Sequence, residues 1–479
     1  MCTTTHTHTH TQTSIIFWTD YKRILATEEL YKSDSVKMAI TLHPLKDPKL
    51  MYRVHQYIQE LRVKRLMQEV SVVQGDIERI THLVPEERRH FKLKKWLWYD
   101  ISSNPSSRYD IAIWEYFNST RLFLAYEHMP VIGLPNRFKV GINNALEVLL
   151  EIMNDREGNT RPFVPPYHLY DGFAVTDHSS GVEYILHMSV HREGSTDPLD
   201  YIANVFLPYQ GAGMVTYRES TEYFQTVVNI IINVGRAADL TTFLQMYEEV
   251  CLRPKSKAHL HIVMFGKNDK VLTKVTQLLK TYPQEHISTY ELSTSAFSYS
   301  RGFSHVANLL EDDDLMVFFD YGFVFTADFL DHCRMNTVKG RQLYFPILFS
   351  FYKPDLVQQH IQRPLQMLIS ADTGFFLRYN YQVVSVFKSD FTSMNGFANS
   401  AQSNSHLNDD VKFVDKVLST DIYAMRALEP HLRRHYRPRT CKGLSGNAHL
   451  VCMNSRADAI GSKKILGSLL VSHDLLDKI

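Results

Sequence analysis

The chain has 479 residues and a formal net charge of +1, since 52 Lys and Arg residues stand against 51 Asp and Glu residues. Hydrophobic residues make up 44% and charged residues 22%, a globular composition that excludes a largely disordered or fibrous protein. The length predicts two or three domains. The balanced charge gives no field that attracts nucleic acid, so we expect no nucleic-acid partner. The sequence contains no run of about 18 apolar residues, so it predicts no membrane span.

The first half predicts a low-complexity tail followed by a mixed helical and α+β region. Residues 1–14 are rich in alternating Thr and His, which is typical of a disordered tail rather than a signal peptide, although the histidines could hold a stray metal. Apolar residues at near-helical spacing predict an amphipathic helix over 50–80 and a second helix over 143–153. A bulky apolar run over 181–186 predicts a strand.

The second half alternates short apolar runs with helical patterns. Strands are predicted over 227–233, 258–265 and 315–319, and helices over 240–250, 271–279 and 304–310. Continuous apolar strands that alternate with helices are typical of parallel strands buried on both faces, so the predicted fold class is α/β with an open sheet. Ligands bind outside the carboxyl ends of such strands, and we therefore expect 233–239 and 320–322 to meet in one crevice.

Asp320 directly follows the predicted strand 315–319. A carboxylate there is a hard oxygen ligand of the kind that a metal bridging a diphosphate requires. A single Asp in this position is more often a turn-former. The three aspartates of 312–314 precede the same strand, and we interpret them as a solvated loop.

Basic and acidic residues elsewhere in the second half have two interpretations each. Arg236 follows Gly235 at a strand end, where its guanidinium is suited to phosphate or a uracil carbonyl, or is a surface group with no partner. Asn408-Asp409-Asp410 precedes a helical pattern and could cap the helix or supply a general base. The basic cluster 433–437 could contact an acidic sugar chain or a leaving diphosphate, or form a solvated face.

Four cysteines, Cys251, Cys333, Cys441 and Cys452, lie in the second half. They favour pairing in an oxidising compartment, and the alternative is four small buried hydrophobes. The glycosylation sequon at Asn118 points the same way. No G-x-S-x-G, H-E-x-x-H, C-x-x-C or Walker motif is present, which argues against the common hydrolases, zinc proteases, redox domains and P-loop enzymes.

Several long blocks carry a resemblance to a known family; they cover 39–44, 300–301, 315–320, 329–337, 344–350, 373–376 and 395–397. These blocks resemble the chondroitin synthase family of animal glycosyltransferases, which includes the chondroitin polymerising factors and the chondroitin N-acetylgalactosaminyltransferases. The resemblance implies a GT-A type domain that takes a UDP-sugar with Mn²⁺ or another divalent cation. It also implies a place in the Golgi lumen or at the Golgi cisterna membrane, where such proteins build chondroitin.

The resemblance sets the expected domain boundaries. After the tail we expect the remnant of a first transferase domain at 15–45, a connecting region at 46–205, the GT-A type domain at 206–460 and a C-terminal tail at 461–479. In the family a membrane anchor and a β3-type transferase domain come first, so the resemblance predicts that this chain is truncated at its N-terminus. Lumenal placement further predicts a disulfide between Cys441 and Cys452.

The resemblance also assigns site residues. It places Arg236, Asp239 and Arg301 on the nucleotide, Asp320 on the metal, and Asp409 and Asp410 among the catalytic carboxylates, with Asp409 where the family has its Glu.

Three departures fall on this one site. The family's D-x-D is Asp320-Tyr321-Gly322, its W-G-x-E-D tract lacks the Trp within 403–410, and its metal-binding His is replaced within 433–437, unless His435 takes that place. With fewer ligands the site binds a divalent ion more weakly, and this ion would stabilise the leaving diphosphate. A catalytic base that is Asp rather than Glu is also shorter, so its carboxylate is misplaced. We therefore expect a degraded metal site.

Two functional hypotheses follow from the degraded site. The chain is either a glycosyltransferase that moves sugar from UDP-GalNAc or UDP-GlcA to a chondroitin oligosaccharide, or a non-catalytic polymerising-factor partner in a hetero-oligomer with an active chondroitin synthase.

Overall fold

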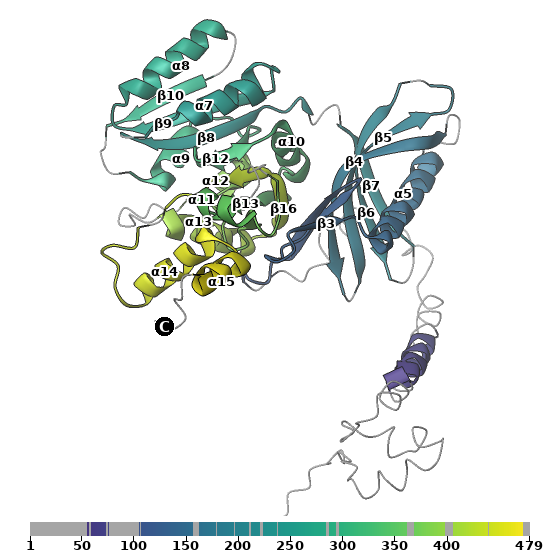
Figure 1. Ribbon diagram of the computed structural model, residues 1–479. Coiled ribbons are helices and arrows are strands. Elements are labelled where there is room, and N and C mark those ends of the chain that lie inside the picture. The colour runs from purple at the N-terminus through teal and green to yellow at the C-terminus, as the bar shows by residue number, and fades with distance from the viewer. Residues whose placement is uncertain are drawn as a thin grey trace, which may run out of the picture. The chain divides into compact units, whose positions relative to one another are not determined.

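The computed structural model describes residues 55–56, 59–72, 75, 105, 107–156, 162–178, 180–195, 197–209, 212–220, 224–236, 238–283, 287–293, 297–361, 368–397, 406–438 and 440–472 (Figure 1). The chain divides into two compact units, Met1–Leu93 and Lys94–Ile479. The predicted tail at 1–14 and the predicted remnant at 15–45 lie outside the described residues. The other predicted domain boundaries remain predictions.

In the first unit, the described residues between 55 and 75 are helical, as the apolar spacing predicts. Val63, Leu66, Met67 and Val70 recur at helical intervals and are all exposed. This helix is drawn in purple in Figure 1. Among the described residues no helix combines the length and the apolar character that spanning a bilayer requires.

The second unit begins with an antiparallel meander. Its strands are β1 (Ile113–Asn118), β2 (Arg121–Phe123), β3 (Val131–Gly133), β4 (Phe163–Asp177), β5 (Gly181–Arg192), β6 (Leu199–Pro208) and β7 (Met214–Glu219). β4 to β7 pair in chain order, and β1 pairs with β4. These elements confirm the predicted strand 181–186.

Helix α5 (Asn136–Arg156) covers one face of this meander (Figure 1). It buries Ile142, Ala145, Leu146, Leu149 and Met153, whose spacing gives one apolar stripe. The stripe packs on apolar side chains of β4 to β6. The predicted helix 143–153 is therefore confirmed, with about two further turns at its N-terminal end.

An open α/β sheet follows the meander. Its first strands are β8 (Val228–Gly235), β9 (Ala258–Phe265), β10 (Ile287–Leu292) and β11 (Leu315–Phe319), in the order β10-β9-β8-β11 and all parallel. The helices between them are α7 (Thr241–Tyr247), the π-helix η3 (Glu248–Leu252), α8 (Asp269–Thr281) and α9 (Tyr299–Ala307). The predicted parallel α/β arrangement is confirmed.

The remaining elements extend the sheet as β15, β13 and β16, and β16 joins β1 of the meander. Their bounds are β12 (Phe323–Phe325), α10 (Ala327–Asn336), β13 (Gln342–Phe351), α11 (Pro354–Ile361), β14 (Gly374–Phe376), β15 (Val384–Phe387), α12 (Lys388–Ser393), α13 (His406–Leu418), β16 (Tyr423–Arg434), α14 (Gly446–Ile460) and α15 (Lys463–Ser472). One continuous path of strands therefore runs through the second unit.

Two predicted helices differ in their limits. α9 begins at Tyr299 rather than at residue 304, because the Ser298 side chain accepts a hydrogen bond from the Arg301 N–H (3.3 Å) and caps the helix. The helix predicted over 240–250 is α-helical only to Tyr247 and continues as the π-helix η3. Apolar periodicity alone does not distinguish these two helical forms.

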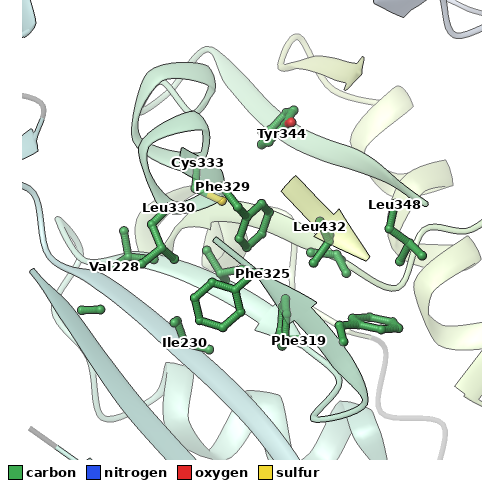
Figure 2. Packing of buried hydrophobic residues seen from close by; sticks show 14 of the residues in the cluster. Val228, Ile230, Phe319, Phe325, Phe329, Leu330, Cys333, Tyr344, Leu348 and Leu432 are labelled. Atoms are coloured by element: carbon green, nitrogen blue, oxygen red, sulfur yellow. The ribbon is translucent and has the colours of Figure 1, made fainter. Parts of the chain in front are cut away.

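The core between the sheet and α10 is rich in aromatic side chains. Figure 2 shows Phe319, Phe325 and Phe329 gathered between β11, β12 and α10, with Val228 and Ile230 of β8 beside them. The rings of Phe319 and Phe325 lie 5.4 Å apart between centroids and meet edge to face. Each buried side chain of this size contributes roughly 1.5–3 kcal/mol, so this core fixes strand β11, which directly precedes Asp320.

Two of the four cysteines form a disulfide and two do not. Cys441 and Cys452 form a disulfide, which confirms the predicted bridge. Cys251 and Cys333 are buried and are not disulfide-bonded, so the prediction that all four pair is wrong for these two. Both pack among apolar side chains of the main core, where a thiol behaves as a small hydrophobe.

A cluster of charged side chains lies where the meander meets the α/β sheet. We call Asp171 of β4, His332 of α10 and Glu429 of β16 the junction cluster. His332 Nδ1 lies 2.7 Å from Glu429 Oε2, and His332 Nε2 lies 3.2 Å from Asp171 Oδ2. Tyr344 donates its hydroxyl to Glu429 (2.8 Å), and Tyr116 donates to Asp171 (3.3 Å).

The charges of the junction cluster stabilise one another. Burial alone would lower the pKa of His332, but Glu429 and Asp171 outweigh it and raise that pKa well above its ordinary value. Burial alone would likewise raise the pKa of Asp171, but His332 and His187 hold it below its usual range. A protonated imidazole between two carboxylates therefore links the two parts of the sheet.

Candidate functional site

A cleft opens at the carboxyl ends of β8 and β11. Its volume is about 660 Å³, within the range of sites for small molecules and cofactors. The lining residues are Gly235, Arg236, Ala238, Phe265, Phe297, Tyr299, Asp320, Tyr321 and Arg437. The prediction that the segments after these two strands meet in one crevice is confirmed.

Arg236 is held at the cleft by its loop. The Asn268 side chain donates to the carbonyl oxygens of Gly235 (3.3 Å) and Ala238 (3.1 Å), and its Oδ1 accepts from Val271 N–H at the start of α8. Gly266 has φ +85°, and an added Cβ there would overlap the Arg236 side chain. The strand-end glycine therefore lets this guanidinium lie across the end of β9.

Asp320 forms the turn expected at its position and also lines the cleft. Its Oδ1 accepts a hydrogen bond from Gly322 N–H (2.7 Å), as in an Asx turn, and its Oδ2 accepts from the Tyr299 hydroxyl (3.2 Å). The same carboxylate lines the cleft, with its side chain 15% exposed. Burial and then the charge of Asp320 raise the pKa of Tyr299, so its hydroxyl stays protonated and donates.

Four aromatic rings line the cleft, and sequence reasoning did not identify them. Phe297 lies 5.0 Å from Phe265 and 4.7 Å from Tyr299 between ring centroids. Tyr321 is the fourth ring. Aromatic faces of this kind suit stacking by a planar base. The signal was present, because Phe265 is the last residue of a strand and Tyr321 adjoins the strand-end Asp320.

Arg437 is the second guanidinium of the cleft. It follows β16 by three residues, and its Nη1 lies 3.4 Å from Asp320 Oδ1. Its guanidinium carbon lies 5.3 Å from the centroid of the Tyr321 ring. The side chain is 49% exposed, so the Arg437 guanidinium pairs with Asp320 and still faces the open cleft.

The predicted basic cluster 433–437 does not act as one group. Arg433 donates to the carbonyl oxygen of Pro430 (2.9 Å), and Arg434 donates to the Ser350 hydroxyl (3.3 Å). Both belong to β16, whereas Arg437 lines the cleft. Of the arginines in this cluster, only Arg437 is therefore placed to meet a ligand there.

The residues around Asp320 do not fit a divalent metal ion. Among the described residues, no group of three or more His, Cys, Asp or Glu side chains could hold one. Gly322 supplies no ligand, and the Arg437 guanidinium already lies against the carboxylate. Two unit positive charges about 4 Å apart repel by about 4 kcal/mol at an effective dielectric constant near 20. A divalent ion at Asp320 would have to displace Arg437.

His435, the alternative metal ligand, lies elsewhere. Its ring stacks on Phe351 with 6.1 Å between centroids, and the residue is not part of the cleft lining. Burial and then the charge of Arg437 lower its pKa. The structure therefore does not bring His435 and Asp320 together in the cleft.

Two predicted nucleotide ligands lie next to the cleft but not in its lining. Asp239 accepts hydrogen bonds from the Thr241 hydroxyl and from Thr241 N–H (2.9 Å), and these bonds lower its pKa to about 2. It also forms an ion pair with Lys274 (3.5 Å). Arg301 lies in the first turn of α9 and is exposed.

The predicted catalytic carboxylates lie in α13. This helix spans His406–Leu418, and Asp409 and Asp410 fall in its first turns. Their side chains lie outside the part of the structure that is described. Their catalytic roles stay predictions.

The acidic loop at 312–314 lies at the amino end of β11, opposite the cleft, as predicted. Asp312 forms an ion pair with Lys388 (2.6 Å), and Asp313 forms one with Lys339. Asp312 and Asp313 are exposed, and Asp314 is half-buried. These carboxylates are therefore a solvated loop with lysine partners.

The sheet and its cleft define an α/β protein with a cleft at the carboxyl ends of parallel strands, the place where open sheets of this class bind their ligands. The family described as "Chondroitin N-acetylgalactosaminyltransferase" matches residues 2–466. The chain belongs to this family of glycosyltransferases. The sheet order confirms the predicted α/β fold class.

Curated relatives match most of this chain. Chondroitin sulfate synthase 3 of Mus musculus is 24% identical over 94% of this chain and 56% of its own length. Chondroitin sulfate synthase 2 of Homo sapiens is 24% identical over 91% of this chain and 58% of its own. Chondroitin sulfate N-acetylgalactosaminyltransferase 1 of Homo sapiens is 26% identical over 69% and 63%. The chain therefore spans less than two thirds of the length of these relatives.

Solved structures are similar only at a low level. The mannosyltransferase PcManGT of Pyrobaculum calidifontis, in complex with GDP-Man and Mn²⁺, is 12% identical, with a TM-score of 0.32 over 52% of this chain and 79% of that chain. GalNAc-T7 with UDP, GalNAc and Mn²⁺ is 10% identical, with a TM-score of 0.33 over 44% of each chain. These scores are too low to support a conclusion about fold or function.

Proposed function

We propose that the cleft binds the UDP part of a nucleotide sugar and that the chain acts in building chondroitin. One observation carries this proposal: Arg236, Asp320 and four aromatic rings converge on a single cleft in a chain of this glycosyltransferase family. The rings offer faces for uracil, and the guanidinium groups offer paired donors for phosphate oxygens.

The proposed reaction is transfer of N-acetylgalactosamine or glucuronate from UDP to a chondroitin oligosaccharide. Asp409, with Asp410 beside it, would accept the proton of the attacking sugar hydroxyl. Asp239 and Arg301 would contact the nucleotide from the rim of the cleft. The Golgi lumen or the Golgi cisterna membrane is the proposed location, and the Cys441–Cys452 disulfide supports an oxidising compartment.

The second candidate function is a non-catalytic partner of an active chondroitin synthase. The observation that favours it is the pairing of Asp320 with Arg437, because this carboxylate is not placed to hold a divalent ion. Such a partner would keep the fold and the nucleotide cleft, and it would act in a hetero-oligomer by stabilising or positioning the active subunit.

UDP binding tests the property that both candidate functions share. Calorimetry with UDP should show binding to the wild-type chain, and Arg236→Gln should weaken it about tenfold or more because a charged hydrogen bond is lost. Arg253→Gln is the matched control, since Arg253 is exposed, pairs with Glu248 and lies outside the cleft lining. Absence of UDP binding by the folded wild-type chain would refute the proposal.

Sugar transfer separates the two candidates. The purified chain is assayed with UDP-GalNAc or UDP-GlcA and a chondroitin oligosaccharide, alone and with a co-expressed active synthase. Transfer by the chain alone that Asp409→Asn abolishes, with UDP binding unchanged, indicates the transferase. No transfer alone, but longer chains from the co-expressed synthase, indicates the partner.

A further inference from the structure

We propose that the Arg437 guanidinium takes the place of a divalent cation in this cleft and neutralises the diphosphate of the bound nucleotide. The inference rests on the proposed UDP binding and adds the group that meets the phosphates. It assigns a role to the misfit between the family's metal motif and the residues that this chain has. It predicts nucleotide binding that needs no added metal.

The first support is the space at Gly322. An ideal Cβ built on Gly322 would overlap the Nη2 and Cζ atoms of Arg437. The guanidinium therefore occupies the space into which a side chain at the second D-x-D position would project. Gly322 replaces the second carboxylate of the D-x-D motif, and the same replacement leaves room for the Arg437 guanidinium. The loss of the carboxylate and the presence of this cation are therefore linked.

The second support is the backbone register that brings the two segments together. β12 pairs antiparallel with β16, with Phe323 opposite Arg434 and Phe325 opposite Leu432. Asp320 precedes β12 by three residues and Arg437 follows β16 by three residues, so the pairing brings both segments to the same end of these two strands. The backbone therefore places the two residues near each other, and the side chains complete the contact.

The third support is the charge of the lining. Two guanidinium groups, Arg236 and Arg437, stand against one carboxylate, Asp320, and the other lining residues are neutral. The lining therefore carries a net positive charge, as an anion site requires. Arg437 offers five N–H donors in a planar fork, which matches two phosphate oxygens.

Asp320 and Tyr321 act as positioning residues for Arg437. The carboxylate holds one edge of the guanidinium at 3.4 Å, and the Tyr321 ring lies 5.3 Å from its central carbon. With one edge held, the remaining donors face the open cleft. A preplaced cation of this kind loses little side-chain freedom when the anion binds.

The test compares UDP binding by the full chain in EDTA and in Mn²⁺. We expect dissociation constants that agree within about threefold, and Arg437→Gln should weaken UDP binding about tenfold or more in EDTA. Uridine, which has no phosphate, should bind wild type and Arg437→Gln equally. Arg437→Lys should recover part of the affinity, because it restores the charge but not the fork. Lys442→Gln removes an exposed charge nearby and should bind like wild type.

Three results would overturn the inference. UDP binding that requires Mn²⁺ would do so and leave the proposed function intact. An equal loss of uridine and UDP affinity in Arg437→Gln would show that the arginine does not act on the phosphates. Absence of UDP binding in both buffers would remove the proposed function and this inference together.

A double variant tests the exchange directly. Gly322→Asp alone should shift the Arg437 guanidinium, which its Cβ would overlap, but the new carboxylate should keep the shifted guanidinium as its partner, so that UDP binding gains no dependence on Mn²⁺. Gly322→Asp combined with Arg437→Ala should weaken UDP binding in EDTA about tenfold and recover at least part of it with Mn²⁺. Recovery by Mn²⁺ in the single Gly322→Asp variant would contradict the proposed role of Arg437.

Discussion

The junction cluster and the cleft each pair a carboxylate with a cation, but they do so in opposite surroundings. At the junction, the side chains of His332 and Glu429 are 1% and 0% exposed. In the cleft, those of Arg437 and Asp320 are 49% and 15% exposed. The imidazole contacts a carboxylate on both ring nitrogens, whereas the guanidinium has one described carboxylate partner and faces the cleft.

This difference separates a structural ion pair from a binding one. A buried pair costs several kcal/mol when one partner is removed, because the remaining charge has no water around it. An exposed pair costs about 0–1 kcal/mol. The junction should therefore govern stability with no direct role in nucleotide binding, and the cleft should govern nucleotide binding with little effect on stability.

The largest effect is expected from His332→Ala. It leaves Asp171 and Glu429 buried without their shared cation, and we expect a loss of about 3–5 kcal/mol in the free energy of unfolding. Urea unfolding at pH 6 measures it. At that pH the contribution of a His with a raised pKa is present, and it is lost as the pH rises through that raised pKa.

The matched control for His332→Ala is His128→Ala, in an exposed turn, which should change stability by no more than about 0.5 kcal/mol. A change below about 1 kcal/mol in His332→Ala would show that the junction cluster does not hold the two parts of the sheet together.

Glu183 sharpens the comparison, because no cation in the described part of the chain offsets the burial of its carboxylate. It lies on β5, it is 5% exposed, and burial raises its pKa to about 8. The folded state then binds this proton more tightly than the unfolded state. Stability falls as the pH rises from about 4.5 towards 8. Glu183→Gln should remove this slope and gain about 4 kcal/mol at pH 8, since one pKa unit corresponds to about 1.4 kcal/mol.

Thermal unfolding between pH 5 and pH 8 measures the effect of Glu183→Gln. The exposed Glu193→Gln on the turn after β5 is the matched control, and its profile should follow wild type. Parallel profiles for wild type and Glu183→Gln would mean that Glu183 is ionised in the fold at neutral pH.

The smallest effect is expected from Arg437→Gln on stability. Because the Asp320–Arg437 pair is partly exposed and 3.4 Å long, its loss should change the free energy of unfolding by no more than about 0.5 kcal/mol. Urea unfolding of this variant and of Lys442→Gln should give overlapping curves. A loss above about 1.5 kcal/mol would make Arg437 a structural residue and remove the contrast with the junction.

Much of the second half could be predicted because its strands are continuous apolar runs. Val228–Gly235, Ala258–Phe265 and Leu315–Phe319 are short, β-branched or aromatic, and closed by Gly or Asp, so both their limits and the position of Asp320 were predictable. The limits of α9 were not, because the Ser298 cap lies outside the apolar pattern.

The remainder of the site could not be predicted, because it depends on pairing between distant segments. Arg437 reaches Asp320 through the β12–β16 register, which joins residues more than 100 positions apart. In the sequence it is one of several arginines between 433 and 437. The aromatic rings come from three separate segments, at 265, 297–299 and 321. No local pattern brings them together.

The pairing of strand β1 limits how the meander and the α/β sheet can move against each other. Its first residues pair in parallel with β16 and its later residues pair antiparallel with β4. A clamshell motion between the meander and the transferase-like sheet would have to rupture one of these ladders. Tightening around a ligand by the loops that bear Arg236 and Arg437 would leave both ladders intact. The radius of gyration of the second unit should consequently stay nearly constant when UDP is added.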